Sequence, residues 1–150
     1  MEHIFPYLSD EEERALLERG GVSRFDPGAV IVREGDHHSA IYVIRVGEVR
    51  VEERSVEFPL EVARLGAGEM FGEMSFIDGL PANADIVADS YVETYVVDSQ
   101  ILDPLLKKYP SIYGRLFRSL AALLARRLRD TASLVNLLNT PAPEWQPDQP

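Results

Sequence analysis

Apolar residues follow two different spacings along the chain, and the change between them comes near Asp98. Before that point they form short runs rich in Val, Ile and Tyr, separated by Gly, Pro, Asp or Ser, which is typical of strands joined by turns. These runs predict strands at 30–33, 41–46, 48–52, 60–65, 85–88 and 91–97. Because no helical pattern lies between them, the spacing favours an antiparallel sandwich or jelly roll over a parallel α/β sheet.

Helical patterns lie on both sides of the strands. Ser9 and Glu12 form the capping box of a short first helix, and Gly20 provides its stop. After Asp98, residues 99–107 predict a second short helix, and residues 111–138 predict one long helix. Its leucines recur at steps of three and four and form an apolar stripe: Leu116, Leu120, Leu123, Leu124 and Leu128. An apolar stripe of this size usually marks an interface, so we expect a homodimer through the long helix.

Composition limits the classes of protein that the chain can belong to. Its 150 residues include no cysteine, which excludes disulfides, thiolate nucleophiles, Cys-ligated zinc and iron–sulfur clusters. The start has no apolar segment of a signal peptide, and no apolar run approaches the ~20 residues of a membrane span. We therefore expect a cytoplasmic protein without membrane contact. Four prolines in residues 139–150 predict a flexible Pro-rich tail.

Acidic residues are concentrated in the first two thirds of the chain. Residues 1–99 contain 21 acidic and 8 basic residues, whereas residues 100–150 contain 4 acidic and 7 basic residues. Binding to phosphate backbones needs clustered cations, so we expect no nucleic-acid partner. We interpret the basic residues of the long helix as a solvated flank of its apolar stripe.

Three sequence patterns resemble those of enzyme sites, but each lacks a feature that the site requires. Gly66, Gly68 and Gly72 place the third glycine one position late for a dinucleotide-binding loop, and they lack the strand–turn–helix context. His37 and His38 are adjacent, so they point to opposite faces of an extended segment, and an exposed turn is the favoured interpretation. The sequence does not identify any two of its 25 acidic residues as a catalytic acid/base pair. We therefore expect no catalytic residues, no metal and no cofactor.

Residues 71–85, FGEMSFIDGLPANAD, have the composition of a binding loop. Gly72 permits close approach of the backbone, and the amides that follow it can form an anion-accepting nest. Glu73 can accept a hydrogen bond from a hydroxyl group. The alternative is a loop whose apolar side chains only close the end of the sandwich.

This segment resembles the phosphate-binding cassette of cyclic nucleotide-binding domains, as found in bacterial catabolite activators and protein kinase A regulatory subunits. Residues 25–28 and 34–36 resemble the family's F-x-P-G…E-G-D, and residues 42–44 and 47–49 resemble its Y-x-I…G-x-V. Residues 125–131, ARRLRDT, resemble the dimer helix of catabolite activators.

The resemblance implies a mainly β fold with flanking helices. We expect one domain over residues 4–138, with an antiparallel β-roll, or jelly roll, at about 22–98 and helices at about 99–138. It also implies a nucleotide pocket inside the roll and a homodimer through the long C-terminal helix.

The resemblance places a ligand pocket at these cassette residues: Phe71, Gly72, Glu73, Met74, Ser75, Ala82, Asn83 and Ala84. Glu73 corresponds to the glutamate that binds the ribose 2′-hydroxyl, and Ser75 to a small residue that serves the phosphate. Thr131 corresponds to a threonine on the adenine side. The family's P-R-S/A-A-T reads PANAD here, so Ala82 replaces the arginine that pairs with the cyclic phosphate.

That replacement decides the expected function. A charge-assisted hydrogen bond contributes about 1.5–3 kcal/mol, so its loss weakens phosphate binding strongly. We expect a stand-alone regulatory and dimerisation module in signal transduction, without enzyme activity, in which cyclic nucleotide binding is weak or lost. A genuine sensor with a replacement cation, such as Arg45 or Arg64, is the alternative. The chain ends shortly after the long helix, so we expect no DNA-binding output domain, and a protein partner to read the signal.

Overall fold

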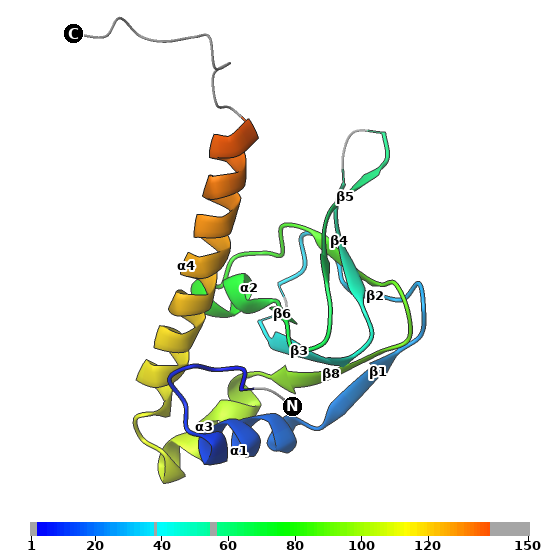
Figure 1. Cartoon of the computed structure of the whole chain (residues 1–150). Coiled ribbons are helices and arrows are strands. Elements are labelled where there is room, and N and C mark those ends of the chain that lie inside the picture. The colour runs from blue at the N-terminus through cyan, green and yellow to red at the C-terminus, as the bar shows by residue number, and fades with distance from the viewer. Residues whose placement is uncertain (1–2, 38, 55–56, 139–150) are drawn as a thin grey trace, which may run out of the picture.

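The computed structural model describes residues 3–37, 39–54 and 57–138, which form two antiparallel sheets with flanking helices (Figure 1). In chain order the elements are α1 (Asp10–Gly20), β1 (Val22–Phe25), β2 (Val30–Val32), β3 (Ile41–Val46), β4 (Val49–Arg54), β5 (Pro59–Leu65), β6 (Met70–Phe71), α2 (Glu73–Asp78), β7 (Asp85–Ala88), β8 (Val92–Val97), α3 (Ser99–Lys108) and α4 (Ile112–Leu138).

The two sheets pair strands that are distant in the sequence. One sheet has the order β1-β8-β3-β6 and the other β2-β7-β4-β5. In the first, Val22 lies opposite Tyr95, and in the second Val30 lies opposite Val87. In each sheet, therefore, a strand from the start of the roll pairs with a strand from its end: β1 with β8, and β2 with β7. The predicted antiparallel β-roll with flanking helices is confirmed.

A first apolar core fills the space between the sheets. It contains Ile44 and Val49, both fully buried, and the ring of Phe71 stacks on Tyr42 with 4.9 Å between the ring centroids. On β4 the side chains alternate, so Val49 and Val51 face this core while Arg50 pairs with Glu52 outside it. The roll therefore has an apolar interior that borders the end where β6 runs into α2.

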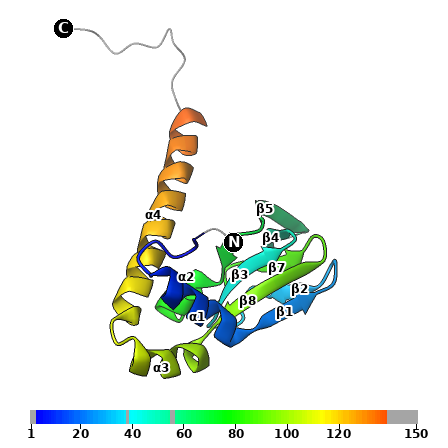
Figure 2. The ribbon, with the colours of Figure 1, turned by 60° about the horizontal axis from the view of Figure 1, so that its bottom comes forward.

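A second apolar core lies between the first sheet and the helices. The α1 helix begins at Ser9, whose hydroxyl accepts from the Glu12 amide at 3.1 Å, while the Glu12 carboxylate accepts from the Ser9 amide at 2.8 Å. The predicted capping box is confirmed. Leu16 of α1 and Leu102 of α3 are fully buried, and the two helices lie side by side at the foot of α4 (Figure 2).

The long helix α4 is divided between this core and solvent. Its first half packs into the second core, where Leu116 and Leu120 are fully buried. Leu123 and Leu124 are half-buried, and Leu128 is 70% exposed. The prediction that all five leucines form one free stripe is therefore wrong for Leu116 and Leu120, because α1, α3 and the N-terminal segment already cover them.

Three short elements were not predicted. The strands β1 and β6, with the sequences VSRF and MF, contain no run of Val, Ile and Tyr. The α2 helix occupies part of the predicted loop, between two glycines with positive φ, Gly72 at 84° and Gly79 at 71°. The predicted tail at 139–150 lies outside the described residues. Within the described ranges, no helix is long and apolar enough to cross a membrane.

Candidate functional site

A cavity of about 180 Å³ lies where the end of the roll meets α2 and α4. All eight predicted pocket residues line it: Phe71, Gly72, Glu73, Met74, Ser75, Ala82, Asn83 and Ala84. The remaining walls come from the sheets and from α4: Val32, Val51, Leu65, Met70, Ile86 and Arg127. The structure thus brings the cassette together around one space, and most of the surface of that space is apolar.

Gly72 shapes this cavity through contact with the protein's own backbone. Its φ of 84° favours glycine, and a Cβ there would collide with the carbonyl oxygen of Ala40 at the start of β3. The close approach that the sequence predicts is therefore made with the neighbouring strand. The amides that follow Gly72 form the first turn of α2, in which Phe76 donates to the Gly72 carbonyl at 3.1 Å.

Glu73 is the buried charge of the cavity, with a residue exposure of 5%. Its Oε1 accepts a charge-assisted hydrogen bond from Nη1 of Arg127, which reaches across from α4. The other terminal nitrogen, Nη2, donates to the Met70 carbonyl at 2.9 Å. Arg127 therefore fastens the middle of α4 to the strand and helix that carry the cassette.

Arg127 is the site residue that the sequence did not reveal. The prediction that the basic residues of the long helix form a solvated flank is wrong for Arg127, which pairs with the buried Glu73. The same correction applies to Arg115, which pairs with the buried Glu12. A buried glutamate 54 positions away gives no local signal in the pattern of a helix.

Ala82 is fixed at the wall of the cavity by its backbone. Its amide donates to the Asp36 carbonyl at 2.9 Å, and its carbonyl accepts from the Gly35 amide at 2.7 Å. These two bonds tie the segment to the turn after β2. A side chain at position 82 therefore starts at the cavity wall, and an alanine leaves that position without charge.

The other proposed cations are paired elsewhere. Arg45 donates to Glu93 at 2.7 Å, and Arg64 donates to Glu48 at 3.0 Å and to Asp89 at 2.6 Å. Arg64 also donates to Glu61, and the hydrogen bonds to Glu61, Glu48 and Asp89 raise its pKa. Neither arginine is among the described residues that line the cavity. Among the described residues, the charged side chains that line the cavity are those of Glu73 and Arg127, so Arg127 is its cation.

The Asp85 carboxylate bonds to groups outside the cavity. Burial opposes its ionisation, but the Glu34 amide at 2.6 Å and the Arg54 guanidinium at 3.1 Å outweigh burial and hold its pKa below the usual value. Asp85 does not line the cavity. Its carboxylate therefore acts as a structural tie between β7 and the β4–β5 hairpin.

Two further predicted positions lie away from the cavity. Thr131 is exposed on α4 and is not part of the lining. His37 is exposed in the turn after β2, and His38 lies outside the described residues. In the part of the chain that the structure describes, no three His, Asp or Glu side chains gather as metal ligands would.

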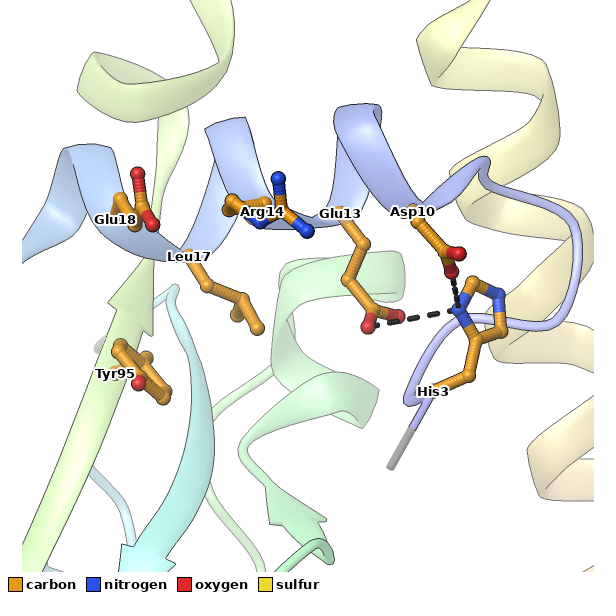
Figure 3. Close-up of a pocket in the computed structure, with 7 residues that line it drawn as sticks. All are labelled: His3, Asp10, Glu13, Arg14, Leu17, Glu18 and Tyr95. Carbon is orange, nitrogen blue, oxygen red and sulfur yellow. Dashed lines mark ion pairs between the residues drawn. The ribbon is translucent and has the colours of Figure 1, made fainter. Parts of the chain in front are cut away.

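A second cavity, of about 360 Å³, lies beside α1 (Figure 3). His3 points between Asp10 and Glu13, at 3.1 and 3.6 Å from their carboxylate oxygens. The other oxygen of Glu13 accepts from the amides of Ile4 and Phe5 at 2.7 and 2.6 Å. These contacts hold the N-terminal segment on α1, so the polar groups of this cavity already serve a structural purpose.

Comparison with known proteins agrees with this geometry. Residues 22–109 match the family model described as "Cyclic nucleotide-binding domain". The "Cyclic AMP receptor protein" of Thermus thermophilus is 33% identical over 146 residues, which cover 91% of this chain and 62% of that protein. The "Cyclic GMP-binding protein C" of Dictyostelium discoideum is 30% identical over 82% of this chain.

Solved structures give the same result. A cyclic nucleotide-binding domain from Methylobacillus flagellatus superposes with a TM-score of 0.77 at 29% identity, and the match covers 92% of this chain and 78% of that one. The chain spans about three fifths of the length of the Thermus protein and 5% of the length of the Dictyostelium protein.

Proposed function

Since the chain belongs to the cyclic nucleotide-binding domain family, we propose that it is a regulatory and dimerisation module whose cavity binds cyclic nucleotides weakly or not at all. The observation that carries this proposal is the charge balance of the cavity. Glu73 and Arg127 line it and pair with each other, and Ala82 stands where the family's cassette has its arginine. A phosphate entering this space meets no unpaired cation among the described lining residues.

The size of the effect follows from the missing bond. A charge-assisted hydrogen bond contributes about 1.5–3 kcal/mol, which corresponds to a loss of about ten- to a hundredfold in affinity. Using Arg127 instead has a cost, because it would leave the buried Glu73 carboxylate without its partner. Both routes therefore lower the affinity for an anionic ligand.

Calorimetric titration with cyclic AMP and cyclic GMP tests the proposal. We expect weak or undetectable binding by the unmodified chain, and a gain of at least about tenfold for Ala82→Arg. Ala82→Met is the matched control, because it adds similar length without charge and should give no gain. Submicromolar binding by the unmodified chain contradicts the proposal.

A second candidate function is a genuine cyclic nucleotide sensor with a replacement cation. The observation in its favour is that Arg127 lines the cavity, although Arg45 and Arg64 do not. In that case the unmodified chain binds cyclic AMP tightly, and Arg127→Met abolishes binding while Arg64→Met leaves it unchanged. Equal losses in both variants, or no binding by the unmodified chain, exclude this candidate.

The dimer is proposed through the outer half of α4. Its exposed positions Ala121, Ala125, Leu128 and Ala132 are four, three and four residues apart and therefore share one face. These small and apolar side chains permit close approach of a second helix. Sedimentation velocity should show a dimer that Leu128→Glu converts to a monomer, whereas Arg129→Glu, next to this face, should have little effect. A monomeric unmodified chain contradicts this part of the proposal.

A further inference from the structure

We propose that the cavity binds a small uncharged molecule that carries hydroxyl groups on an apolar or flat body, the chemistry of a nucleoside without phosphate. This inference rests on the proposed function, because it assigns a ligand class to the cavity that a cyclic phosphate enters poorly. Three features of the lining lead to it: its charge balance, its unpaired polar groups and its apolar walls.

The charge balance favours a neutral ligand over either ion. The Glu73 carboxylate has 7% side-chain exposure and is compensated by Arg127, so the charged groups of the lining cancel. An anionic ligand would add a net negative charge to this half-buried space, and a cationic ligand would add a net positive one. Both carry a desolvation cost that a neutral ligand avoids.

Polar groups without protein partners are nevertheless present in the lining. Arg127 occupies Oε1 of Glu73, while Oε2 has no hydrogen-bond partner within the described part of the chain. The same holds for the hydroxyl of Ser75, a residue with 8% exposure, and for the side-chain amide of Asn83. The carboxylate oxygen accepts a hydrogen bond, and the hydroxyl and amide both donate and accept, so the set matches alcohol groups on a ligand.

The apolar part of the lining indicates what kind of body the ligand has. Val51 of β4, Leu65 of β5 and Ile86 of β7 line the cavity on the side of the roll, and Phe71 lines it next to the polar groups. Such walls accept an apolar or aromatic body, whose polar edge then meets Glu73 and Ser75. The volume of about 180 Å³ is below the usual range of ligand pockets, which favours the smaller of two molecules that share one body.

Calorimetric titration of the full chain with two matched pairs of probes tests this inference: adenosine against cyclic AMP, and guanosine against cyclic GMP. Within at least one pair we expect the nucleoside to bind at least about tenfold more tightly than the cyclic nucleotide. Ala82→Arg should reverse that order, because it adds a cation at the cavity wall.

Glu73→Gln separates the contribution of the carboxylate from that of the apolar walls. It should weaken nucleoside binding by about tenfold and, by removing the negative charge that compensates Arg127, strengthen cyclic nucleotide binding. Ser75→Ala is the second variant and should also weaken nucleoside binding. Cooperative thermal unfolding of each variant in the absence of ligand checks that the fold is retained.

The outcomes distinguish this inference from the proposed function. If neither nucleoside binds and Ala82→Arg still gains cyclic AMP affinity, the inference is overturned and the proposed function stands. If the unmodified chain binds each cyclic nucleotide more tightly than the matching nucleoside, the inference is overturned. If that cyclic nucleotide binding is also submicromolar, the proposed function is overturned with it. Nucleoside binding that Glu73→Gln and Ser75→Ala leave unchanged also overturns the inference, because the binding would then occur elsewhere.

Discussion

The two halves of α4 use the same chemistry for different purposes. Each half carries an arginine that pairs with a buried glutamate from an earlier part of the chain: Arg115 with Glu12, and Arg127 with Glu73. The two glutamates are buried to nearly the same degree, with exposures of 6% and 5%. What differs is the number of other groups that hold each pair and what lies next to it.

The pair at the foot of α4 is held from several sides. Both terminal nitrogens of Arg115 bond to Glu12, one of them also contacts the hydroxyl of Ser111 at 2.9 Å, and the Glu12 carboxylate completes the capping box with Ser9. Tyr7 covers this region, since its amide donates to the Ser119 hydroxyl at 2.9 Å and Arg118 lies 4.0 Å above its ring. Both carboxylate oxygens of Glu12 are thus bonded to Arg115, and within the described residues Glu12 lines neither the 180 Å³ nor the 360 Å³ cavity.

The pair in the middle of α4 is held more loosely and borders open space. Glu73 has one described hydrogen-bond partner, Arg127, and the 180 Å³ cavity lies beside it. Around Arg127 the helix is already emerging from the core, because Arg126 and Leu128 are both exposed. Two glutamates of similar burial therefore differ in the number of groups that hold them, and of the two only Glu73 lines the 180 Å³ cavity.

Core packing should give the largest difference between the two halves. Leu120→Ala removes fully buried atoms at the foot of α4 and should lower the free energy of unfolding by about 3 kcal/mol. Leu128→Ala, in the exposed half, should change it by less than about 0.5 kcal/mol in a monomer. Urea denaturation at low protein concentration measures both, and similar losses would show that the helix is equally packed along its length.

Replacement of Arg115 and of Arg127 should give the next largest difference in unfolding free energy between the two halves of α4. Arg115→Met leaves Glu12 buried without its partner and should cost about 2 kcal/mol in unfolding free energy. Arg127→Met should cost about half as much, since the cavity lets water reach Glu73. Urea denaturation at neutral pH compares the two variants. A larger loss of unfolding free energy for Arg127→Met would show that the Glu73 pair stabilises the fold more than the Glu12 pair does.

The foot of α4 should also carry a pH dependence. Hydrogen bonding from Arg115, with help from Ser9, outweighs burial and lowers the pKa of Glu12 to about 2. Because the folded pKa is depressed, its stabilisation is complete above the unfolded value of about 4.5 and is lost as the pH falls toward 2. The free energy of unfolding from urea denaturation should therefore fall less between pH 5 and about pH 3 in Glu12→Gln than in the unmodified chain, by on the order of 1 kcal/mol. Parallel curves for the two proteins would contradict this assignment.

The exposed arginines of the outer half should have the smallest effect. Arg126 and Arg129 face solvent on a protein with a net charge of −10, so we expect no binding to random duplex DNA at physiological salt. Replacing both by serine should leave fluorescence anisotropy titrations unchanged. Micromolar binding by the unmodified chain that the double variant loses would make the outer half a nucleic-acid surface.

The features that could be predicted from the sequence have local causes. The capping box depends on two residues three positions apart, Ser9 and Glu12, and the longer strands depend on runs of β-branched side chains. The cassette could be recognised because its eight lining residues fall in two short stretches, 71–75 and 82–84. In these places neighbours in the sequence determine the structure.

The features that could not be predicted depend on contacts between distant residues. Nothing near Arg127 indicates that it pairs with Glu73, and nothing near Leu120 separates it from Leu128, which repeats it in the helical pattern. The strands β1 and β6 are defined by their partners β8 and β3 rather than by their own residues. Tertiary packing decides these cases, and a single sequence contains no local record of it.

The length of helix between the two arginine pairs has a mechanical consequence. Arg115 and Arg127 are separated by twelve residues, which is about 18 Å along an α-helix. When α4 tilts as a rigid helix by about 10° around Arg115, Arg127 moves by about 3 Å. That travel equals the length of a hydrogen bond, whereas Leu120, five residues from Arg115, moves by only about 1.3 Å, so the contact with Glu73 is more sensitive to a tilt of the helix than the packing at its foot.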